Sequence, residues 1–271
     1  MDYIYIKLKS YKNKVYEITL NNPNSRNALN AKMLEEFTLC LQKVSNEKEC
    51  RVLIITGSGN TFSAGADLEW MKESIELSVE ENKIDALKFS KMLKTLDEFF
   101  CPTIAMINGH AFGGGLGIIS VCDFAIADTE AKFCFSEVRL GLIPAMIGPY
   151  ILRSIGFFNT KRLFLTGEIF NAELAVSLNL ISMAVEKKNF LNEREKIIEK
   201  ILLAGPKAQL EIKSYLQNIY NNNIDNVLIN KAADSIARIR VSDEAQEGIK
   251  AFLNKKKPKW QEDNTKYSKF I

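Results

Sequence analysis

Three consecutive glycines, Gly113 to Gly115, lie between a strand-like apolar run and a helix-like one in the segment NGHAFGGGLGIIS. Glycine weakens the interior of helices and strands, so a cluster of this kind marks a turn or a close approach to the backbone. A similar order of apolar run, glycine turn and small residues occurs earlier, in VLIITGSGNTFSAGADL. The chain therefore carries two turns of one design, and its fold must accommodate both.

The two turns suit an anion. Amide N–H groups at the start of a helix have no intrahelical partner and favour negative charge. Two such turns side by side would hold one oxyanion between two N–H donors, with small residues leaving the approach open. A role in helix packing or tight turning alone explains the glycines equally well. The dinucleotide-binding pattern G-x-G-x-x-G fits this segment poorly and is discounted.

Apolar runs and helical periodicities alternate along the first half of the chain. Strands are expected in KVYEITL, RVLIITG, PTIAMI and FAIAD, and helices after an N-cap at Asn30 and over residues 78–99. After Pro144 the periodicity is mostly helical. This order predicts an α/β core in residues 1–195, followed by a C-terminal helical region in residues 196–271.

Composition narrows the class of protein. The 271 residues are 46% hydrophobic and 25% charged, as expected for a chain that buries a large core. A net charge of +3, with one short basic block, NKKKPKW, argues against a nucleic-acid partner. The five cysteines form no C-x-x-C pair and indicate reduced thiols rather than a disulfide framework. No secretory or membrane-spanning run occurs, so we expect a cytoplasmic protein without a membrane partner.

Five blocks of the sequence resemble the crotonase, or enoyl-CoA hydratase/isomerase, superfamily in order and spacing. The inner blocks are FSAGADL, NGHAFGGGLG and SEVRLGLIP, and the outer ones are NNPNSRNALN and FLNKKKP. Within the superfamily, GADLEWM, SEVRLGLIPAMIGPY and the tail IARIRVSDEAQEGIKAFLNKKKPKW are most similar to bacterial 3-methylglutaconyl-CoA hydratases. The resemblance covers essentially the whole chain. It implies a spiral core of repeated ββα turns, with C-terminal helices that drive assembly into homotrimers or hexamers.

The resemblance also assigns site residues. The oxyanion hole of the family is made by two backbone N–H groups, which map to Ala66 and Gly114. These groups would polarise the thioester carbonyl of an acyl-CoA and stabilise the enolate formed in catalysis. Phe252 and Lys255 are expected to reach CoA from a neighbouring subunit. CoA is part of the substrate, so the resemblance implies no separate cofactor and no metal. The remaining CoA contacts map to Arg26, Ala28, Ala64, Asp67 and Leu68.

Glu137, in the segment FCFSEV, maps to the second of two catalytic glutamates that many hydratases of the family use. Alternation along a strand would place it on one face with Phe133 and Phe135, where desolvation raises the pKa of a carboxyl group. The first family glutamate maps to Gly117, which carries no side chain. Arg139 lies two residues beyond Glu137, and is either a partner for a distal carboxylate on the acyl group or a surface ion-pair residue.

Three interpretations of Gly117 are open. Glu137 with an ordered water could hydrate alone, one glutamate could shuttle a proton as in Δ3,Δ2-enoyl-CoA isomerases, or Gly117 could widen the pocket for a branched acyl chain. We expect a lyase that adds water to an α,β-unsaturated acyl-CoA, either methylglutaconyl-CoA or a related branched enoyl-CoA of leucine or fatty-acid breakdown. Isomerisation is the alternative within enzymes. A non-catalytic or RNA-binding homologue is the hypothesis from a different class.

Three further residues near these motifs need an interpretation. The single histidine, His110, precedes the glycine run and is expected to pack or hydrogen-bond rather than to catalyse. Trp70 and Met71 follow GADLE and are candidates for the wall of an acyl pocket or for the core. Neither G-x-S-x-G nor H-E-x-x-H occurs, so no serine-hydrolase or zinc-protease motif supports a competing function.

Overall fold

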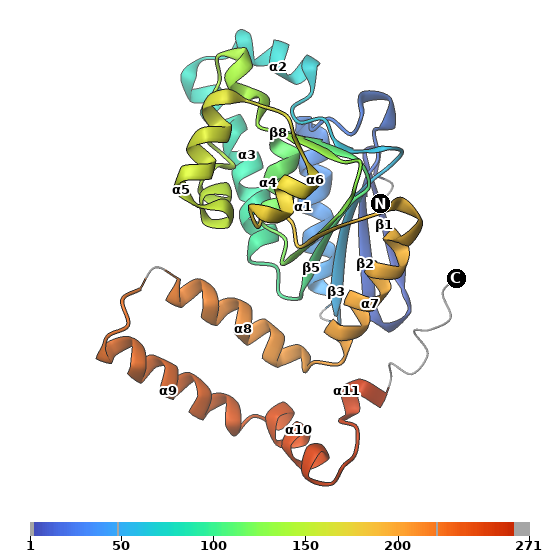
Figure 1. Ribbon diagram of the computed structural model, residues 1–271, viewed down its shortest axis with the longest axis vertical. Coiled ribbons are helices and arrows are strands. Elements are labelled where there is room, and N and C mark those ends of the chain that lie inside the picture. The colour runs from blue at the N-terminus through green and yellow to red at the C-terminus, as the bar shows by residue number, and fades with distance from the viewer. Residues whose placement is uncertain (1–2, 48, 221, 263–271) are drawn as a thin grey trace.

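The computed structural model describes residues 3–47, 49–220 and 222–262 of the chain. It contains two sheets, whose strands are β1 (Ile6–Tyr11), β2 (Val15–Leu20), β3 (Val52–Gly57), β4 (Thr61–Ser63), β5 (Thr103–Ile107), β6 (His110–Phe112), β7 (Phe124–Asp128), β8 (Lys132–Cys134), β9 (Phe170–Asn171) and β10 (Met183–Val185). The large sheet has six strands in the order β1-β2-β3-β5-β7-β10, and the small one has the order β4-β6-β8-β9 (Figure 1). In the large sheet β1 pairs antiparallel with β2, and all other neighbours pair in parallel.

The chain alternates between the two sheets. β3 leads into β4 and α2 (Leu68–Ile75), and β5 leads into β6 and α4 (Gly114–Ser120). β7 leads into β8 and a 3-10 helix at Ser136–Leu140. Parallel pairing stacks these units side by side, so equivalent turns gather at one edge of each sheet. The arrangement confirms the predicted α/β fold with repeated ββα turns.

Helices cover both faces of the large sheet (Figure 1). Asn30 begins the first of them as predicted, because its Oδ1 accepts a hydrogen bond from Met33 N at 2.8 Å. α5 (Gly148–Thr166) changes direction at Gly156, where φ is 76°. Within the described residues, one face of the large sheet is covered by five helices, which are α1 (Ala31–Asn46), α3 (Val79–Asp97), α4, α5 and α6 (Ala172–Ser177).

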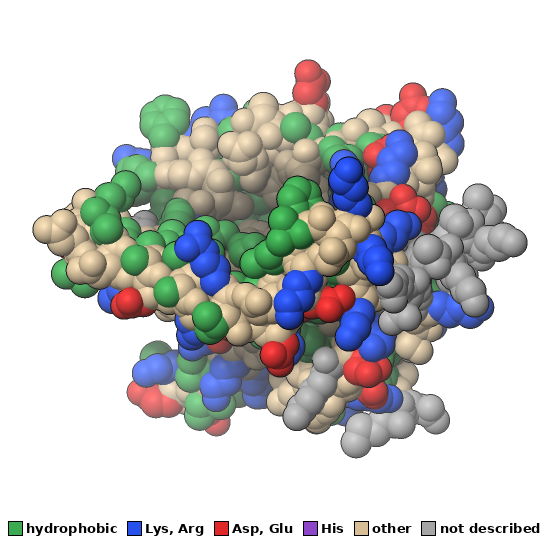
Figure 2. Space-filling model, turned by 90° about the horizontal axis from the view of Figure 1, so that it is seen from below, with side chains coloured by type: hydrophobic (Ala, Val, Ile, Leu, Met, Phe, Trp, Pro, Cys, Tyr) green, Lys and Arg blue, Asp and Glu red, His purple; other side chains and the backbone are tan. Residues whose placement is uncertain are grey.

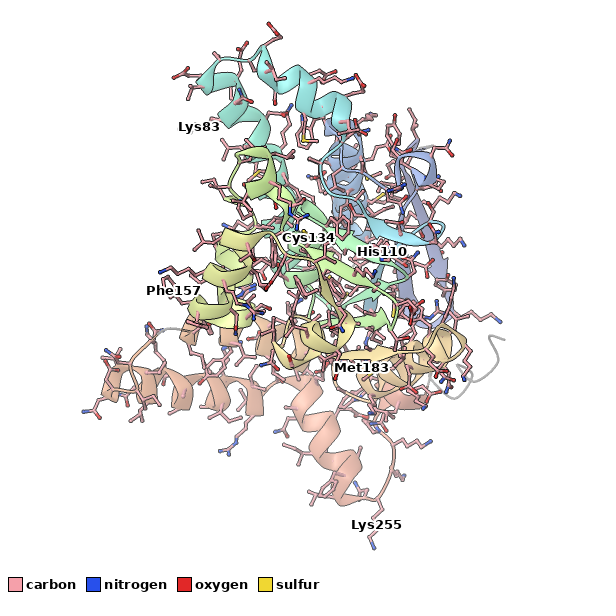
Figure 3. The ribbon with its side chains drawn as sticks, turned by 45° about the horizontal axis from the view of Figure 1, so that its top comes forward. Lys83, His110, Cys134, Phe157, Met183 and Lys255 are labelled. Atoms are coloured by element: carbon pink, nitrogen blue, oxygen red, sulfur yellow. The ribbon has the colours of Figure 1, made fainter. Side chains whose placement is uncertain are left out.

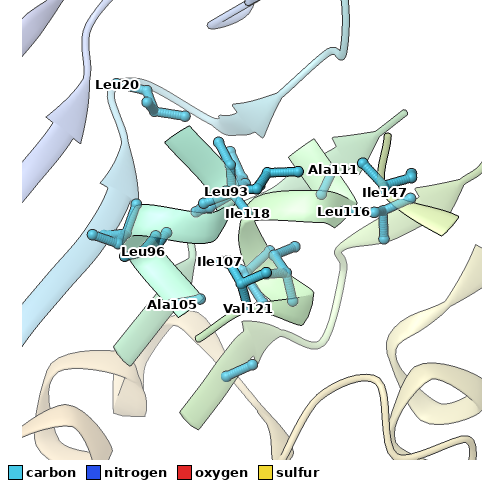
Figure 4. Close-up of a cluster of buried hydrophobic side chains, with 14 of the residues drawn as sticks. Leu20, Leu93, Leu96, Ala105, Ile107, Ala111, Leu116, Ile118, Val121 and Ile147 are labelled. Atoms are coloured by element: carbon cyan, nitrogen blue, oxygen red, sulfur yellow. The ribbon is translucent and has the colours of Figure 1, made fainter. Parts of the chain in front are cut away.

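The short helix α4 lies at the centre of the main core. Figure 4 shows its Leu116 and Ile118 among Leu93 of α3 and Ile147, which immediately precedes α5. Both α4 side chains are fully buried. Burial of one such side chain contributes about 1.5–3 kcal/mol, so this packing fixes the glycine-rich start of α4 against its neighbours.

The opposite face of the large sheet is covered by α7 (Phe190–Leu202). The predicted boundary at 195/196 falls inside this helix, whose last two turns are the part that packs on the sheet. The core therefore extends further along the chain than the sequence suggests. The α7 side chains buried against the sheet are Ile197, Ile198, Ile201 and Leu202.

Beyond α7 the chain forms a helical arm of α8 (Pro206–Ile219), α9 (Asn226–Arg240), α10 (Asp243–Leu253) and α11 (Lys259–Glu262). Neither α8 nor α9 has a buried residue, and α8 contacts the core through polar groups. Lys213 Nζ lies 2.6 Å from Asp123 Oδ2, and Gln217 Nε2 donates to Asp97 O at 3.1 Å. Apolar side chains are exposed along the arm (Figure 2), including Leu210, Ile212, Leu216, Val227, Ile229 and Ile236.

Two of the elements that the sequence did not predict are β1 and α2. β1 is the edge strand of the large sheet. Just before it, Tyr5 N donates a hydrogen bond to the Glu36 carboxylate of α1 at 2.7 Å. α2 is only eight residues long and has no buried residue. Within the described residues, no helix is both long and apolar enough to cross a membrane.

A buried asparagine joins the loop before α1 to the turn after β3. Asn27 is fully buried, and its φ of 55° lies in the left-handed region that asparagine tolerates better than most residues. Its Oδ1 accepts from Asn22 N at 2.9 Å and from Ser58 Oγ at 3.1 Å. Its Nδ2 donates to Ser58 O at 2.9 Å and to Thr61 O at 2.7 Å. The side chain thus uses its whole hydrogen-bonding capacity inside the protein.

We predict that Asn27→Ala lowers the free energy of unfolding by about 3 kcal/mol, because it strands buried partners and strains the backbone. Urea unfolding measures this change. Asn24→Ala, at an exposed position in the same loop, is the matched control and is expected to change stability by less than about 0.5 kcal/mol. Equal effects of the two substitutions would contradict this role of Asn27.

Candidate active site

A cavity of about 920 Å³ opens beside the two glycine turns. Its walls come from five segments: the loop before α1, the turn after β4 with α2, one face of α3, the start of α4, and residues 136–147. Eight of the twelve site residues predicted from the sequence line it. These eight are Arg26, Ala28, Ala64, Ala66, Asp67, Leu68, Gly114 and Glu137.

The two glycine turns touch each other. Gly65 and Gly113 have φ values of 90° and 48°, in the region that favours glycine. A Cβ atom on Gly65 would lie 3.1 Å from Phe112 O, and one on Gly113 would lie 3.1 Å from Glu137 Oε1. Side chains at these positions would push the turns apart and displace the carboxylate. The glycines are therefore required by backbone conformation and by close approach together.

The backbone N–H groups of Ala66 and Gly114 have no acceptor in the part of the chain that the structure describes. Leu29 forms backbone hydrogen bonds with the residues on either side of Ala66. Leu29 N donates to Gly65 O at 2.7 Å, and Asp67 N donates to Leu29 O at 2.9 Å. Gly114 is the first residue of α4, where an N–H has no intrahelical partner. Both residues line the cavity, so two unpartnered donors belong to one site. Their role as an oxyanion hole stays a prediction.

Glu137 is not on a strand, and the predicted alternation with Phe133 and Phe135 is wrong. β8 ends at Cys134, and the 3-10 helix that follows is closed by Gly141, whose φ is 74°. Leu142 N donates to Glu137 O at 3.0 Å, which fixes the turn beside the cavity. The carboxylate reaches the cavity because of this turn, and not because of strand periodicity.

The carboxylate of Glu137 lies in a desolvated place. Its Oε2 is buried and has no hydrogen-bond partner in the described part of the chain. Burial raises the pKa of the Glu137 carboxyl above its ordinary value of 4.5, and a backbone hydrogen bond opposes this only partly. A buried carboxyl oxygen without a partner, on the wall of a cavity, is suited to exchange a proton with a bound molecule.

Gly117 does not itself line the cavity. It is buried and lies outside the cavity lining, on the side of α4 that faces α5. A Cβ atom there would lie 2.3 Å from Ile147 Cγ2 and 3.4 Å from Leu93 Cδ1. The space that a side chain at position 117 would need is therefore filled by Ile147. Because Gly117 has no side chain, Ile147 of the cavity lining packs against α4, and an enlargement of the pocket by Gly117 stays a prediction.

Five of the seven residues predicted to contact CoA line the cavity, namely Arg26, Ala28, Ala64, Asp67 and Leu68. Arg26 is exposed and is the one basic side chain among the lining residues that the structure describes. Asp67 Oδ1 accepts from Glu69 N at 3.0 Å, so this carboxylate caps α2 and holds it over the cavity. Contact between these residues and CoA stays a prediction.

Three predicted site residues lie elsewhere on the surface. Arg139 is exposed and outside the cavity lining, so within this chain it is not placed to meet an acyl group. The side chain of Phe252 is 82% exposed at the end of α10. Figure 3 shows Lys255 at the bottom of the molecule, far from Cys134 near its centre. Cys134 is the last residue of β8 and precedes the Glu137 turn. A contribution of Phe252 and Lys255 to a neighbouring subunit's site stays a prediction.

His110 also lies away from the cavity. Its Nδ1 accepts a hydrogen bond from Lys132 N at 3.2 Å, between β6 and β8. Its ring stacks on Phe112 with the ring centroids 6.2 Å apart. This confirms the expected hydrogen-bonded role, on a side chain that is exposed.

Most of the side chains that form the apolar wall of the cavity were not predicted from the sequence. Trp70 and Met71 line the cavity, and Trp70 Nε1 donates to Asp85 of α3, which ties α2 to α3. The side chains that were missed are contributed by α3 and by the segment after Glu137. The block SEVRLGLIP pointed to part of this segment, but nothing in it distinguished cavity walls from core. The missed residues include Phe89, Leu142, Ile143, Met146 and Ile147.

The chain matches the profile of the family described as Enoyl-CoA hydratase/isomerase over residues 10–264. It is 31% identical over 250 residues to the Short-chain-enoyl-CoA hydratase of Clostridium acetobutylicum, covering 90% of this chain and 93% of that protein. It is 32% identical over 246 residues to the Crotonyl-CoA hydratase of Syntrophomonas wolfei, covering 90% and 93%. The solved structure of an enoyl-CoA hydratase from Shewanella pealeana matches with a TM-score of 0.92 at 35% identity, covering 95% and 96%. The chain therefore belongs to the enoyl-CoA hydratase/isomerase family.

The raised pKa of Glu137 predicts a pH-dependent stability. Above pH 4.5 the unfolded chain ionises this carboxyl more readily than the folded protein does, so stability falls as pH rises towards the folded pKa. Glu137→Gln removes this penalty. We expect the variant to have a higher Tm than the wild type at pH 7, with the difference shrinking as pH is lowered to 4.5. Calorimetry at both pH values measures it, and a difference independent of pH would contradict the burial of an ionised Glu137.

Proposed function

We propose that the protein is an acyl-CoA hydratase that adds water across the α,β double bond of an enoyl-CoA thioester. The observation that carries this proposal is the unpartnered carboxyl oxygen of Glu137, next to two glycine turns with free N–H donors. The proposal is supported by the hydratases among the relatives, at 31% and 32% identity over most of the chain.

In this mechanism the N–H groups of Ala66 and Gly114 bind the thioester oxygen and stabilise the enolate as it forms. Glu137, with its raised pKa, takes a proton from water while the oxygen of that water bonds to the β-carbon. The same carboxyl then gives its proton to the α-carbon. One water is consumed, the double bond becomes single, and Glu137 returns to its starting state. A single carboxylate thus suffices, in agreement with the absence of a side chain at Gly117.

The acyl group fits the apolar inner wall of the cavity. The exposed position of Arg139 removes the support for a distal carboxylate that the sequence suggested. A methylglutaconyl group would bring a second charge to a wall that includes Leu142, Ile143 and Ile147. We therefore place an uncharged enoyl chain first and keep methylglutaconyl-CoA as the alternative substrate. Assembly into trimers or hexamers and a cytoplasmic location stay predictions of the resemblance.

Isomerisation is the second candidate function. It needs one base to move a proton between two carbons of the acyl chain, and the buried part of the cavity offers one carboxylate, Glu137, in the described residues. Hydration is placed first because the relatives reported above are hydratases.

The test is turnover of crotonyl-CoA, 3-methylglutaconyl-CoA and a 3-enoyl-CoA in separate assays, with products identified by mass. Hydration adds the mass of water, and isomerisation leaves the mass unchanged. We expect a gain of water, fastest with crotonyl-CoA. A shifted double bond at unchanged mass would replace hydration by isomerisation. RNA binding that stays tight at high salt, with no turnover on any acyl-CoA, would overturn the proposal.

Glu137→Gln is expected to reduce kcat by at least about 100-fold, the scale of lost general acid–base catalysis, while CoA-ester binding stays nearly unchanged. Steady-state kinetics and calorimetric titration with butyryl-CoA measure the two effects. Glu73→Gln, at an exposed position of α2 outside the cavity lining, is the matched control and should retain wild-type kcat. A fully active Glu137→Gln variant would remove Glu137 from the mechanism.

A further inference from the structure

The cavity becomes more buried along its apolar wall. Leu142 and Ile143 are 53% and 78% exposed, whereas Ile147, a few residues later, is 2% exposed. Leu29 and Phe89 are also buried and line the same cavity. The inner end of the cavity is therefore formed by Leu29, Phe89 and Ile147, and all three are apolar.

These three side chains pack directly on the glycines of α4. A Cβ atom on Gly114 would lie 3.0 Å from Leu29 Cδ1 and 3.2 Å from Phe89 Cζ. A Cβ atom on Gly117 would overlap Ile147 Cγ2 at 2.3 Å. Gly114 and Gly117 are three residues apart, so they share one face of the helix. Because Gly114 and Gly117 have no side chains, the three inner-wall residues pack closer to the backbone of α4 than they could if another residue type stood at either position.

Ile147 is held firmly in this position. Its carbonyl oxygen accepts from Ile151 N at 3.0 Å as α5 begins, and Gly148 N donates to Pro144 O at 2.9 Å in the turn before it. Figure 4 shows its side chain beside Leu116 of α4 within the buried cluster. A side chain fixed by its own helix start, at the inner end of the cavity, limits what the cavity can hold.

We propose that Ile147 is the specificity-determining residue for acyl-chain length. Its side chain occupies the volume that a side chain at position 117 would take, and it closes the inner end of the cavity. This inference rests on the proposed function only in assuming that the cavity holds the acyl group of a CoA ester. Ile147 takes no part in proton transfer, and it acts through the space that it fills beside α4.

The experiment compares crotonyl-CoA with trans-2-octenoyl-CoA. For Ile147→Ala, which removes three carbon atoms, the ratio of kcat/KM for the longer substrate to that for the shorter one is expected to rise by at least about tenfold, the lower end of the effect of one methylene in an apolar pocket. Ile147→Val should give a smaller rise. Ile151→Ala, a fully buried position one turn along α5 and outside the cavity lining, is the matched control, and its ratio should equal that of the wild type.

A second measurement tests the packing without turnover. Gly117→Ala should lower the Tm in the wild-type background and lower it less in the Ile147→Ala background, because the overlapping Cγ2 atom is gone. In the Ile151→Ala background the loss should match that in the wild type. Equal losses in all three backgrounds, together with an unchanged chain-length ratio, would overturn the proposal.

Binding separates this inference from the proposed function. Titration with butyryl-CoA and octanoyl-CoA measures the same preference without chemistry. If no enoyl-CoA is turned over but Ile147→Ala shifts binding towards octanoyl-CoA, the role of Ile147 stands and hydration falls. If crotonyl-CoA is hydrated while neither ratio changes in Ile147→Ala, hydration stands and the role of Ile147 falls.

Discussion

The hydrogen bonds of the buried Asn27 side chain are the constraint on which the candidate site depends. They hold the loop before α1 against the turn between β3 and β4, and the backbone extends the link, since Ala64 N donates to Arg26 O at 3.0 Å. Ser63 Oγ adds a bond to Asn27 O at 2.9 Å. Arg26 and Ala28 on one segment, and Ala64 and Ala66 on the other, therefore face one cavity as a single rigid wall.

The second turn joins this wall through glycine contacts rather than side-chain bonds. A Cβ atom on Gly65 would lie 3.6 Å from Gly113 Cα, and one on Gly113 would lie 3.1 Å from Glu137 Oε1, so the approach at Gly113 leaves little room for a side chain. The contact between the two turns thus consists of backbone groups and the carboxyl group of Glu137. In the proposed mechanism, preorganised backbone donors need no rearrangement when charge develops on a bound oxygen, so close glycine packing and catalysis would place the same demand on this sequence.

Local signals predicted most of the fold. Continuous apolar runs marked β3 and β5, and the cap at Asn30 marked the start of α1. The position of Glu137 was not predicted correctly, because the alternation in FCFSEV resembles a strand. Glu137 instead lies in a 3-10 helix that is closed by Gly141. The contact of Ile147 with Gly117 left no local signal, since it joins segments far apart in the chain. Side chains that meet across the fold need the structure, whereas caps and strand runs do not.

The polar attachment of α8 has a consequence for the order in which a nascent chain can fold. Both sheets and the helix that covers the far face of the large sheet are complete once Leu202 has been synthesised. α8 and α9 contribute no buried side chain to this core. The spiral can therefore close while the arm is still being made, and domains generally fold as units from the N-terminus during synthesis. The apolar side chains of the arm then become available last, on a core that is already formed.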